Sequence, residues 1–162
     1  MRAADIMSTD VVTIDRLASI FTAAQLMKQQ QVRALIVPPA SERDAYGIIT
    51  ATDISRSVAD GKNPKVTYVC QVMTEPCIVV NPDLAVEHIA KLFARAKIRI
   101  APVIQGQLLG IISLNDLLTK TDCLSKISAD STPQEKAELT ELFGAEISEI
   151  DPDKLCENWC SG

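Results

Sequence analysis

The chain has 162 residues, a formal net charge of −5, 47% hydrophobic residues and only 4% aromatic residues. This length predicts one domain or two small ones. The acidic balance, with a pI near 4.9, argues against a nucleic-acid surface, which needs clustered basic residues. No apolar run is long enough to predict a membrane span. The N-terminus lacks the apolar stretch of a secretory signal, which favours a cytoplasmic protein.

The first part of the chain, residues 1–65, alternates signals for short strands and helices. Short runs of β-branched or continuously apolar residues favour strands, whereas apolar residues three or four positions apart favour amphipathic helices. In chain order these patterns predict a helical turn at 3–7, a strand at 11–14, a helix at 20–31, strands at 34–37 and 46–50, and a helix from 54 to 61. Thr52 or Asp53 is expected to cap the last helix, because short polar side chains satisfy its first backbone N–H groups.

The second part of the chain repeats the first. A shift of 66 residues aligns Met7 with Met73, and a shift of 63 residues aligns segment 47–53 with segment 110–116. The three missing residues fall in a loop, where a deletion costs little. These coincidences predict an internal repeat in which each half runs strand, helix, strand, strand, helix. Neither half alone covers its small sheet, so the two halves should pack together.

Two copies of one motif carry a family resemblance. Gly-Ile-Ile-Thr-Ala-Thr-Asp at 47–53 and Gly-Ile-Ile-Ser-Leu-Asn-Asp at 110–116 share a glycine, two hydrophobic residues, a Ser or Thr, and an Asp three positions later. The matching flanking residues are Met7, Met73, Arg33, Arg99 and Pro102. This pattern resembles a tandem pair of cystathionine-beta-synthase-type (CBS) domains, a Bateman module, over residues 1 to about 122. One departure is Ile36, which stands where the second repeat has the family's common proline.

The resemblance implies an α/β (α+β) fold of two repeated β-α-β-β-α units with pseudo-two-fold packing. The units would span 1–65 and 66–122, followed by a short helical tail at 123–162. It also implies an adenosine-type ligand in clefts that the two repeats share. Family modules usually pair face to face as a flat dimer, so we expect a homodimer or a higher homo-oligomer.

The hydroxyl and the carboxylate of each motif are the first candidates for a ligand site. One carboxylate can accept both hydroxyls of a ribose, and Asp53 and Asp116 are placed for that task. Thr50 and Ser113 supply a hydroxyl near the start of the following helix, where the backbone amides favour a phosphate. Asp53 and Asp116 can equally be plain helix N-caps, and their spacing leaves both roles open.

Three arginines are candidates for binding a phosphate. Arg33 and Arg99 each lie between a helix and a strand, and a guanidinium pairs with phosphate oxygens as a planar fork. Arg56 follows Asp53 by about one helical turn. Each of the three can instead be a solvated surface residue, and Arg33 or Arg99 can pair with a carboxylate. The single histidine, His88, is expected to be structural or exposed.

The tail at 123–162 is predicted to form two short amphipathic helices. The second helix places Cys156 and Cys160 on one face, where an intrahelical disulfide would be strained and a metal site would lack two ligands. The odd cysteine count favours free thiols, and the five cysteines are Cys70, Cys77, Cys123, Cys156 and Cys160. We expect the tail to dock on the module or on a second copy. The alternatives are a redox-sensitive tail that binds a partner enzyme, as in some CBS-pair proteins of photosynthetic organisms, or a truncated piece of a longer segment.

These features predict a non-enzymatic regulatory protein. It would bind an adenine nucleotide, with AMP placed before ADP and ATP and S-adenosylmethionine last, and pass its occupancy to a partner or to its own assembly. The ligand would favour one packing of the halves and shift its population. The alternatives are an oligomerisation scaffold with empty clefts and a redox-sensitive protein that acts through the tail. An enzyme is not expected, because the sequence lacks a nucleophile–base pair, a metal cluster and a phosphate-binding glycine loop.

Overall fold

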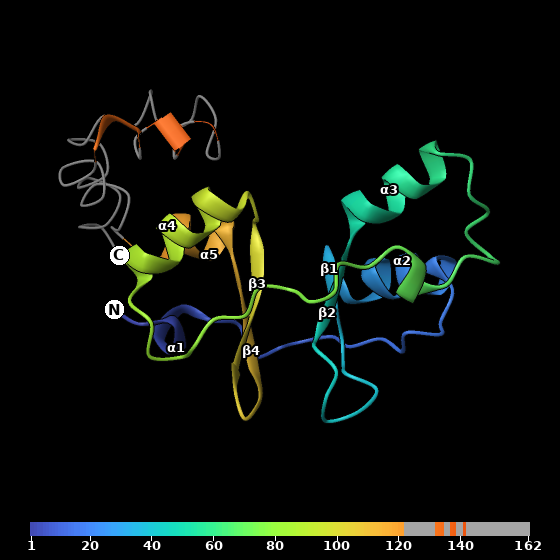
Figure 1. Ribbon diagram of the computed structural model, residues 1–162, viewed down its shortest axis with the longest axis horizontal. Coiled ribbons are helices and arrows are strands. Elements are labelled where there is room, and N and C mark those ends of the chain that lie inside the picture. The colour runs from blue at the N-terminus through green and yellow to red at the C-terminus, as the bar shows by residue number, and fades with distance from the viewer. Residues whose placement is uncertain (122–131, 135–136, 139–140, 142–162) are drawn as a thin grey trace.

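Two similar halves lie side by side, each with a two-stranded antiparallel sheet and helices on the outer side (Figure 1). The computed structural model describes residues 1–121, 132–134, 137–138 and 141. The elements in chain order are α1 (Ala3–Ile6), α2 (Ile20–Gln30), β1 (Ala34–Val37), β2 (Gly47–Thr50), α3 (Ala51–Ala59), the 3-10 helix η1 (Val69–Gln71), α4 (Val86–Ala96), β3 (Ile100–Gln105), β4 (Gln107–Ser113) and α5 (Leu114–Lys120). This mixed helix and strand architecture confirms the predicted fold class.

The first strand expected in each half is present only as a single bridge. Thr13 pairs with Ile36 in the first half, and Val80 pairs with Val103 in the second, both in parallel. The backbone bonds around the first bridge run from Ile36 to Val12 and from Ile14 to Ile36, at 3.0 Å each. The predicted order of elements therefore holds, but the first strand of each half is reduced to a single bridge to β1 or β3.

Three hydrophobic clusters form the core. One lies within each half, centred on the faces of α2 and α4 that point to the sheets. The third joins the halves, because Ala34, Ile36 and Ile48 of the first sheet are buried together with partly buried residues of the second, such as Ile100 and Ile111. The two sheets thus cover each other, as expected for halves that cannot cover their own sheets.

Each half also packs against a segment from the start of the other repeat. Ser8 exchanges two backbone hydrogen bonds of 2.9 Å with Ile111 of β4, and Thr74 exchanges bonds of 2.9 and 3.0 Å with Ile48 of β2. Ile6 is 1% exposed in the core of the second half, and Val69 is fully buried in the core of the first. Residues 1–8 therefore pack with the second half, and residues 69–74 pack with the first.

The two crossing segments, residues 1–8 and 69–74, explain why each motif begins with a glycine. A Cβ atom on Gly110 would lie 2.7 Å from the carbonyl oxygen of Ser8 and 2.8 Å from the sulfur of Met7. A Cβ atom on Gly47 would lie 2.9 Å from the sulfur of Met73. The crossing segments can approach the two strands this closely only because the glycines have no side chain.

The described part of the tail is short. Pro133, Gln134, Ala137, Glu138 and Glu141 are helical. The predicted second tail helix lies outside the described residues, as do Cys123, Cys156 and Cys160. Cys70 and Cys77 are free thiols. No helix among the described residues has the length and apolar character needed to cross a membrane.

Candidate ligand-binding site

The first strand-to-helix corner is a complete capping box at the start of α3. Thr50 is the N-cap, and its Oγ1 accepts a hydrogen bond from the backbone N–H of Asp53 at 3.2 Å. In return, Oδ2 of Asp53 accepts from the backbone N–H and from the hydroxyl of Thr50, both at 2.9 Å. The expected cap at Thr52 or Asp53 is corrected accordingly: the N-cap is Thr50, and Asp53 is its partner three positions later.

The second corner, at the start of α5, repeats this geometry. The Oγ of Ser113 accepts from the N–H of Asp116 at 3.2 Å. Oδ2 of Asp116 accepts from the backbone N–H of Ser113 at 2.8 Å and from its hydroxyl at 2.9 Å. Both aspartates are therefore the third-position partners of a capping box, and in each case the box occupies one carboxylate oxygen.

The other carboxylate oxygen differs between the two corners. Among the described residues, Oδ1 of Asp53 has no hydrogen-bond donor. Oδ1 of Asp116 lies 2.8 Å from Nζ of Lys120, which also donates to the carbonyl of Ile6 at 3.0 Å. Asp116 is buried and Asp53 is partly exposed. Capping and ligand binding are thus compatible at Asp53, because they would use different oxygens.

Two of the three candidate arginines lie beside the corners. The carbonyl of Arg33 accepts from the N–H of Ala51 at 2.9 Å, and the carbonyl of Arg99 accepts from the N–H of Leu114 at 2.7 Å. Both side chains are exposed, and neither pairs with a carboxylate of the described residues. Arg56 is exposed on α3 and likewise has no such partner there.

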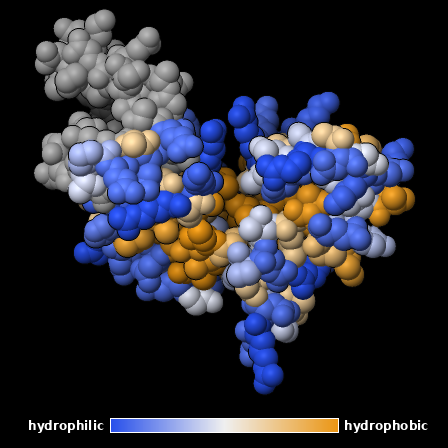
Figure 2. All heavy atoms as spheres, turned by 45° about the horizontal axis from the view of Figure 1, so that its top comes forward, coloured by the Kyte–Doolittle hydropathy of each residue, from blue (hydrophilic) through white to orange (hydrophobic). Residues whose placement is uncertain are grey.

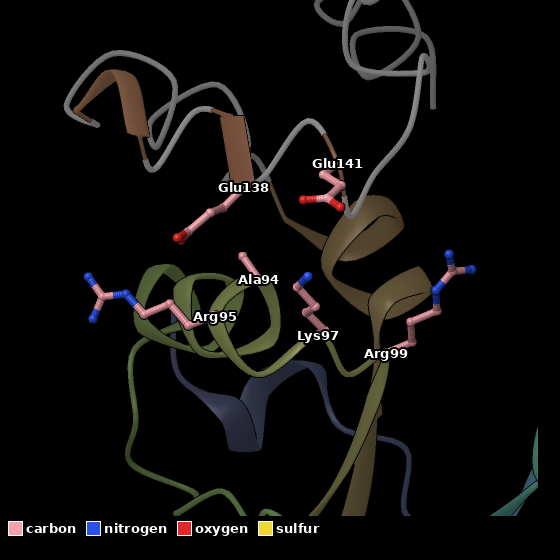
Figure 3. A pocket seen from close by; sticks show the side chains of 6 residues that line it. All are labelled: Ala94, Arg95, Lys97, Arg99, Glu138 and Glu141. Atoms are coloured by element: carbon pink, nitrogen blue, oxygen red, sulfur yellow. The ribbon is translucent and has the colours of Figure 1, made fainter.

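Arg99 also borders a small cavity at the end of α4. This cavity has a volume of about 240 Å³, and its other lining residues are Ala94, Arg95, Lys97, Glu138 and Glu141. In Figure 3 the guanidinium of Arg99 points away from the side chains of Arg95 and Glu138. Arg95 and Lys97 were not predicted as site residues, although basic residues stand at every second position from 95 to 99.

A groove lies between the two halves. Figure 2 shows hydrophobic side chains at its floor and hydrophilic side chains on both sides. The cluster that joins the halves includes Ala34 and Ile100, which pair across their sheets with Thr50 and Ser113. Figure 1 shows α3 and α5 leaving the sheets at the same end. The two polar corners therefore lie next to apolar strands, an arrangement suited to a ligand with a flat apolar ring and a hydroxyl-bearing part.

The model of the CBS domain matches residues 3–60 and 69–122. The chain belongs to the CBS-domain family. It is 36% identical over 115 residues to the CBS domain-containing protein YhcV of Bacillus subtilis (strain 168), a match of 70% of this chain and 80% of YhcV. Other curated relatives are longer, since the chain spans 57% of one and 22% of another.

Solved structures of CBS proteins share this fold. The hexameric CBS-CP12 protein from bloom-forming cyanobacteria is 41% identical, with a TM-score of 0.74, over 88% of this chain and 96% of that one. The CBS domain pair of protein MJ0100, in complex with 5-methylthioadenosine and S-adenosyl-L-methionine, is 26% identical with a TM-score of 0.64. That match covers 73% of this chain and 97% of the MJ0100 pair.

Proposed function

We propose that this CBS pair is a non-enzymatic sensor of adenosine compounds. It binds an adenine nucleotide, AMP in the first place and ADP or ATP as alternatives, in the groove between its repeats. The bound ligand favours one packing of the halves, and this change regulates a partner or the protein's own assembly. A ligand acts in this way only if it binds the two packings with different affinity.

One observation carries this proposal: Asp53 presents, beside an apolar groove, a carboxylate oxygen that has no donor in the described part of the chain. A ribose offers two adjacent hydroxyl donors, and a carboxylate oxygen can accept both. A hydrogen bond to a charged group contributes about 1.5–3 kcal/mol, which corresponds to about a tenfold to hundredfold change in Kd. Thr50 fixes the orientation of this carboxylate through the capping box.

The charge near the corners supports a phosphate-bearing ligand. Arg33 and Arg99 have exposed side chains next to the corners, with no carboxylate partner among the described residues. Arg56 on α3 adds a third exposed guanidinium. A guanidinium binds a phosphate with two parallel hydrogen bonds, so these residues favour a nucleotide over a nucleoside.

The adenosine group is supported by the MJ0100 pair, whose two ligands, 5-methylthioadenosine and S-adenosyl-L-methionine, both contain it. Neither ligand carries a phosphate. S-Adenosylmethionine is therefore tested beside AMP. Tighter binding of AMP would indicate that the arginines bind its phosphate.

A melting-temperature titration tests the proposal. AMP, ADP, ATP, S-adenosylmethionine and 5-methylthioadenosine are compared with GMP and CMP as controls. A ligand at 100 times its Kd should stabilise the protein by about 2.7 kcal/mol. Replacing Asp53 with Ala should remove most of that shift. If no adenosine compound raises the melting temperature at millimolar concentration, the sensor proposal is wrong and the scaffold alternative takes its place.

Self-assembly is the second candidate function, because the first half exposes a group of large apolar side chains. Leu17 is 66% exposed, Val66 is 70% exposed and Tyr68 is 49% exposed. Phe21 is 39% exposed, and its backbone N–H donates to the carbonyl of Pro64, two residues before Val66. We propose that a second copy of the chain covers this surface. The hexameric state of the similar CBS-CP12 protein supports an assembly of several copies.

The tail is proposed to be a partner-binding segment. The two CBS repeats end at residue 122, and the 88% match to the CBS-CP12 protein reaches beyond them. Residues 123–162 contain nine acidic and three basic residues, a net charge of −6, whereas the repeats carry about +1. An acidic segment of this kind favours a partner with a basic surface. A pull-down of candidate enzymes with and without residues 123–162, under reducing and oxidising conditions, tests both this role and the redox alternative.

A further inference from the structure

The two corners differ at the position four residues after the aspartate. The shift of 63 residues aligns Ser57 with Lys120, each one turn after its aspartate. The hydroxyl of Ser57 is buried and has no hydrogen-bond partner among the described residues. Lys120 instead reaches back along α5, and its Nζ lies 2.8 Å from Oδ1 of Asp116. The first corner therefore has no counterpart of this ion pair.

A second contact holds Lys120 in place. Its Nζ donates to the carbonyl oxygen of Ile6 at 3.0 Å, at the end of α1. Ile6 is 1% exposed and belongs to the core of the second half, so this carbonyl has a fixed position. The side chain of Asp116 is 13% exposed, and that of Lys120 is 46% exposed. The ammonium group thus bridges two acceptors that are far apart in the sequence.

This contact removes the oxygen that a ribose would need. In both corners Oδ2 already accepts two hydrogen bonds from the capping box. A ribose must therefore use Oδ1, which is paired with an ammonium group in Asp116 and receives no hydrogen bond from the described residues in Asp53. Two neutral hydroxyls would have to displace a charged donor from Asp116 and leave the carbonyl of Ile6 without its donor.

We propose that Lys120 makes the two corners unequal, so that the ribose of an adenosine ligand binds at Asp53 and not at Asp116. This inference rests on the proposed function. It assigns Lys120 as the residue that sets the number of ligands per chain. The module then holds one ligand next to the first half, and the second corner serves to fasten α1 to α5.

Isothermal titration calorimetry with AMP, and separately with S-adenosylmethionine, tests this assignment. We expect one ligand per chain in the unsubstituted protein. Replacing Asp53 with Asn keeps an oxygen for the cap but should weaken binding at least tenfold. Lys120→Ser gives the second corner the residue of the first and should raise the stoichiometry from one to two. Lys120→Arg keeps a cation beside Asp116 and should leave the stoichiometry at one.

The outcomes separate this inference from the function on which it rests. Two equal sites in the unsubstituted protein, or a single site after Lys120→Ser, would overturn the role of Lys120 while leaving the sensor proposal intact. Weaker binding after Lys120→Ser would show that Lys120 helps to bind the ligand, which also contradicts the inference. No binding of either compound by the unsubstituted protein would overturn the proposed function. A melting curve of each variant confirms that it is folded.

Discussion

The two halves of this protein have the same fold and different surfaces. Where the second half pairs Arg2 with Asp83 at 3.2 Å, the corresponding positions of the first half are Tyr68 and Leu17, both exposed. These positions correspond because the bridge from Arg2 to Ala85 repeats the bridge from Tyr68 to Ser19. The second half therefore has an ion pair at the positions where the first half exposes apolar side chains.

The corners differ in the same direction. Lys120 pairs with Oδ1 of Asp116 in the second corner, whereas the equivalent Ser57 leaves Oδ1 of Asp53 without a donor among the described residues. What the halves share is internal: the caps, the crossing segments and the glycines that admit them. A duplicated unit can thus keep its packing while the surroundings of its two aspartates diverge.

The largest expected effect is on self-assembly, when the first half is given the residues of the Arg2–Asp83 ion pair. The double substitution Leu17→Asp and Tyr68→Arg should break self-assembly, because each large apolar side chain removed from an interface costs about 1.5–3 kcal/mol. Sedimentation velocity at micromolar concentration measures the mass. The control is Asp83→Ala, which removes an exposed ion pair worth less than about 1 kcal/mol and should leave the mass unchanged. Equal masses for the unsubstituted protein, the double variant and Asp83→Ala would show that Leu17 and Tyr68 do not form the interface between copies.

The two motif glycines should differ in their tolerance of a methyl group. Gly110→Ala places a Cβ atom 2.7 Å from a backbone oxygen, and overpacking of this kind costs about 1–3 kcal/mol. Gly47→Ala mainly meets the flexible side chain of Met73 at 2.9 Å. The loss of unfolded-state entropy, about 0.4–1 kcal/mol, should offset much of that strain. Urea unfolding of both variants gives the comparison, and a larger loss for Gly47→Ala would contradict it.

The smallest expected difference concerns the caps, where the halves are alike. Thr50→Ala and Ser113→Ala should each lower the free energy of unfolding by about 1 kcal/mol, because the N-cap bonds have the same length of 3.2 Å. Guanidinium unfolding of the two single variants measures these losses. Ser113→Ala should not cost more than Thr50→Ala, since Lys120 continues to hold Asp116. A clearly greater loss for Ser113→Ala would show that the ion pair does not hold Asp116 without the cap.

Much of the fold could be predicted from the chain alone. The helix expected at 20–31 and the strands expected at 34–37 and 46–50 lie within one residue of α2, β1 and β2, whereas α3 begins three residues before the helix expected from 54. The strand expected at 11–14 and its counterpart in the second repeat were predicted too long. Their β-branched residues pair with the sheet through only one bridge each. Propensity reports what a segment can form, whereas the length of a strand depends on the partner that it meets.

The candidate site was predictable in part. The repeat pointed to Thr50, Asp53, Ser113 and Asp116, and the structure places each pair in one capping box. Their role in binding a ligand stays a prediction, as do those of the arginines. The sequence could not show which oxygen of each aspartate the cap uses, because the capping box and a ribose site require the same residue types at the same spacing.

The sequence by itself determined the repeat, the order of its elements and the two polar corners. These features follow from periodicity and capping, which act over a few neighbouring residues. Only the tertiary structure decided that the first segments of the repeats exchange halves, that the glycines admit them, and that Lys120 reaches the carbonyl of Ile6. The ion pair of Lys120 with Asp116 spans only four positions, whereas the bond from Lys120 to Ile6 joins residues that are 114 positions apart. No local pattern encodes that meeting, because it depends on how α1 packs against α5 in the folded chain.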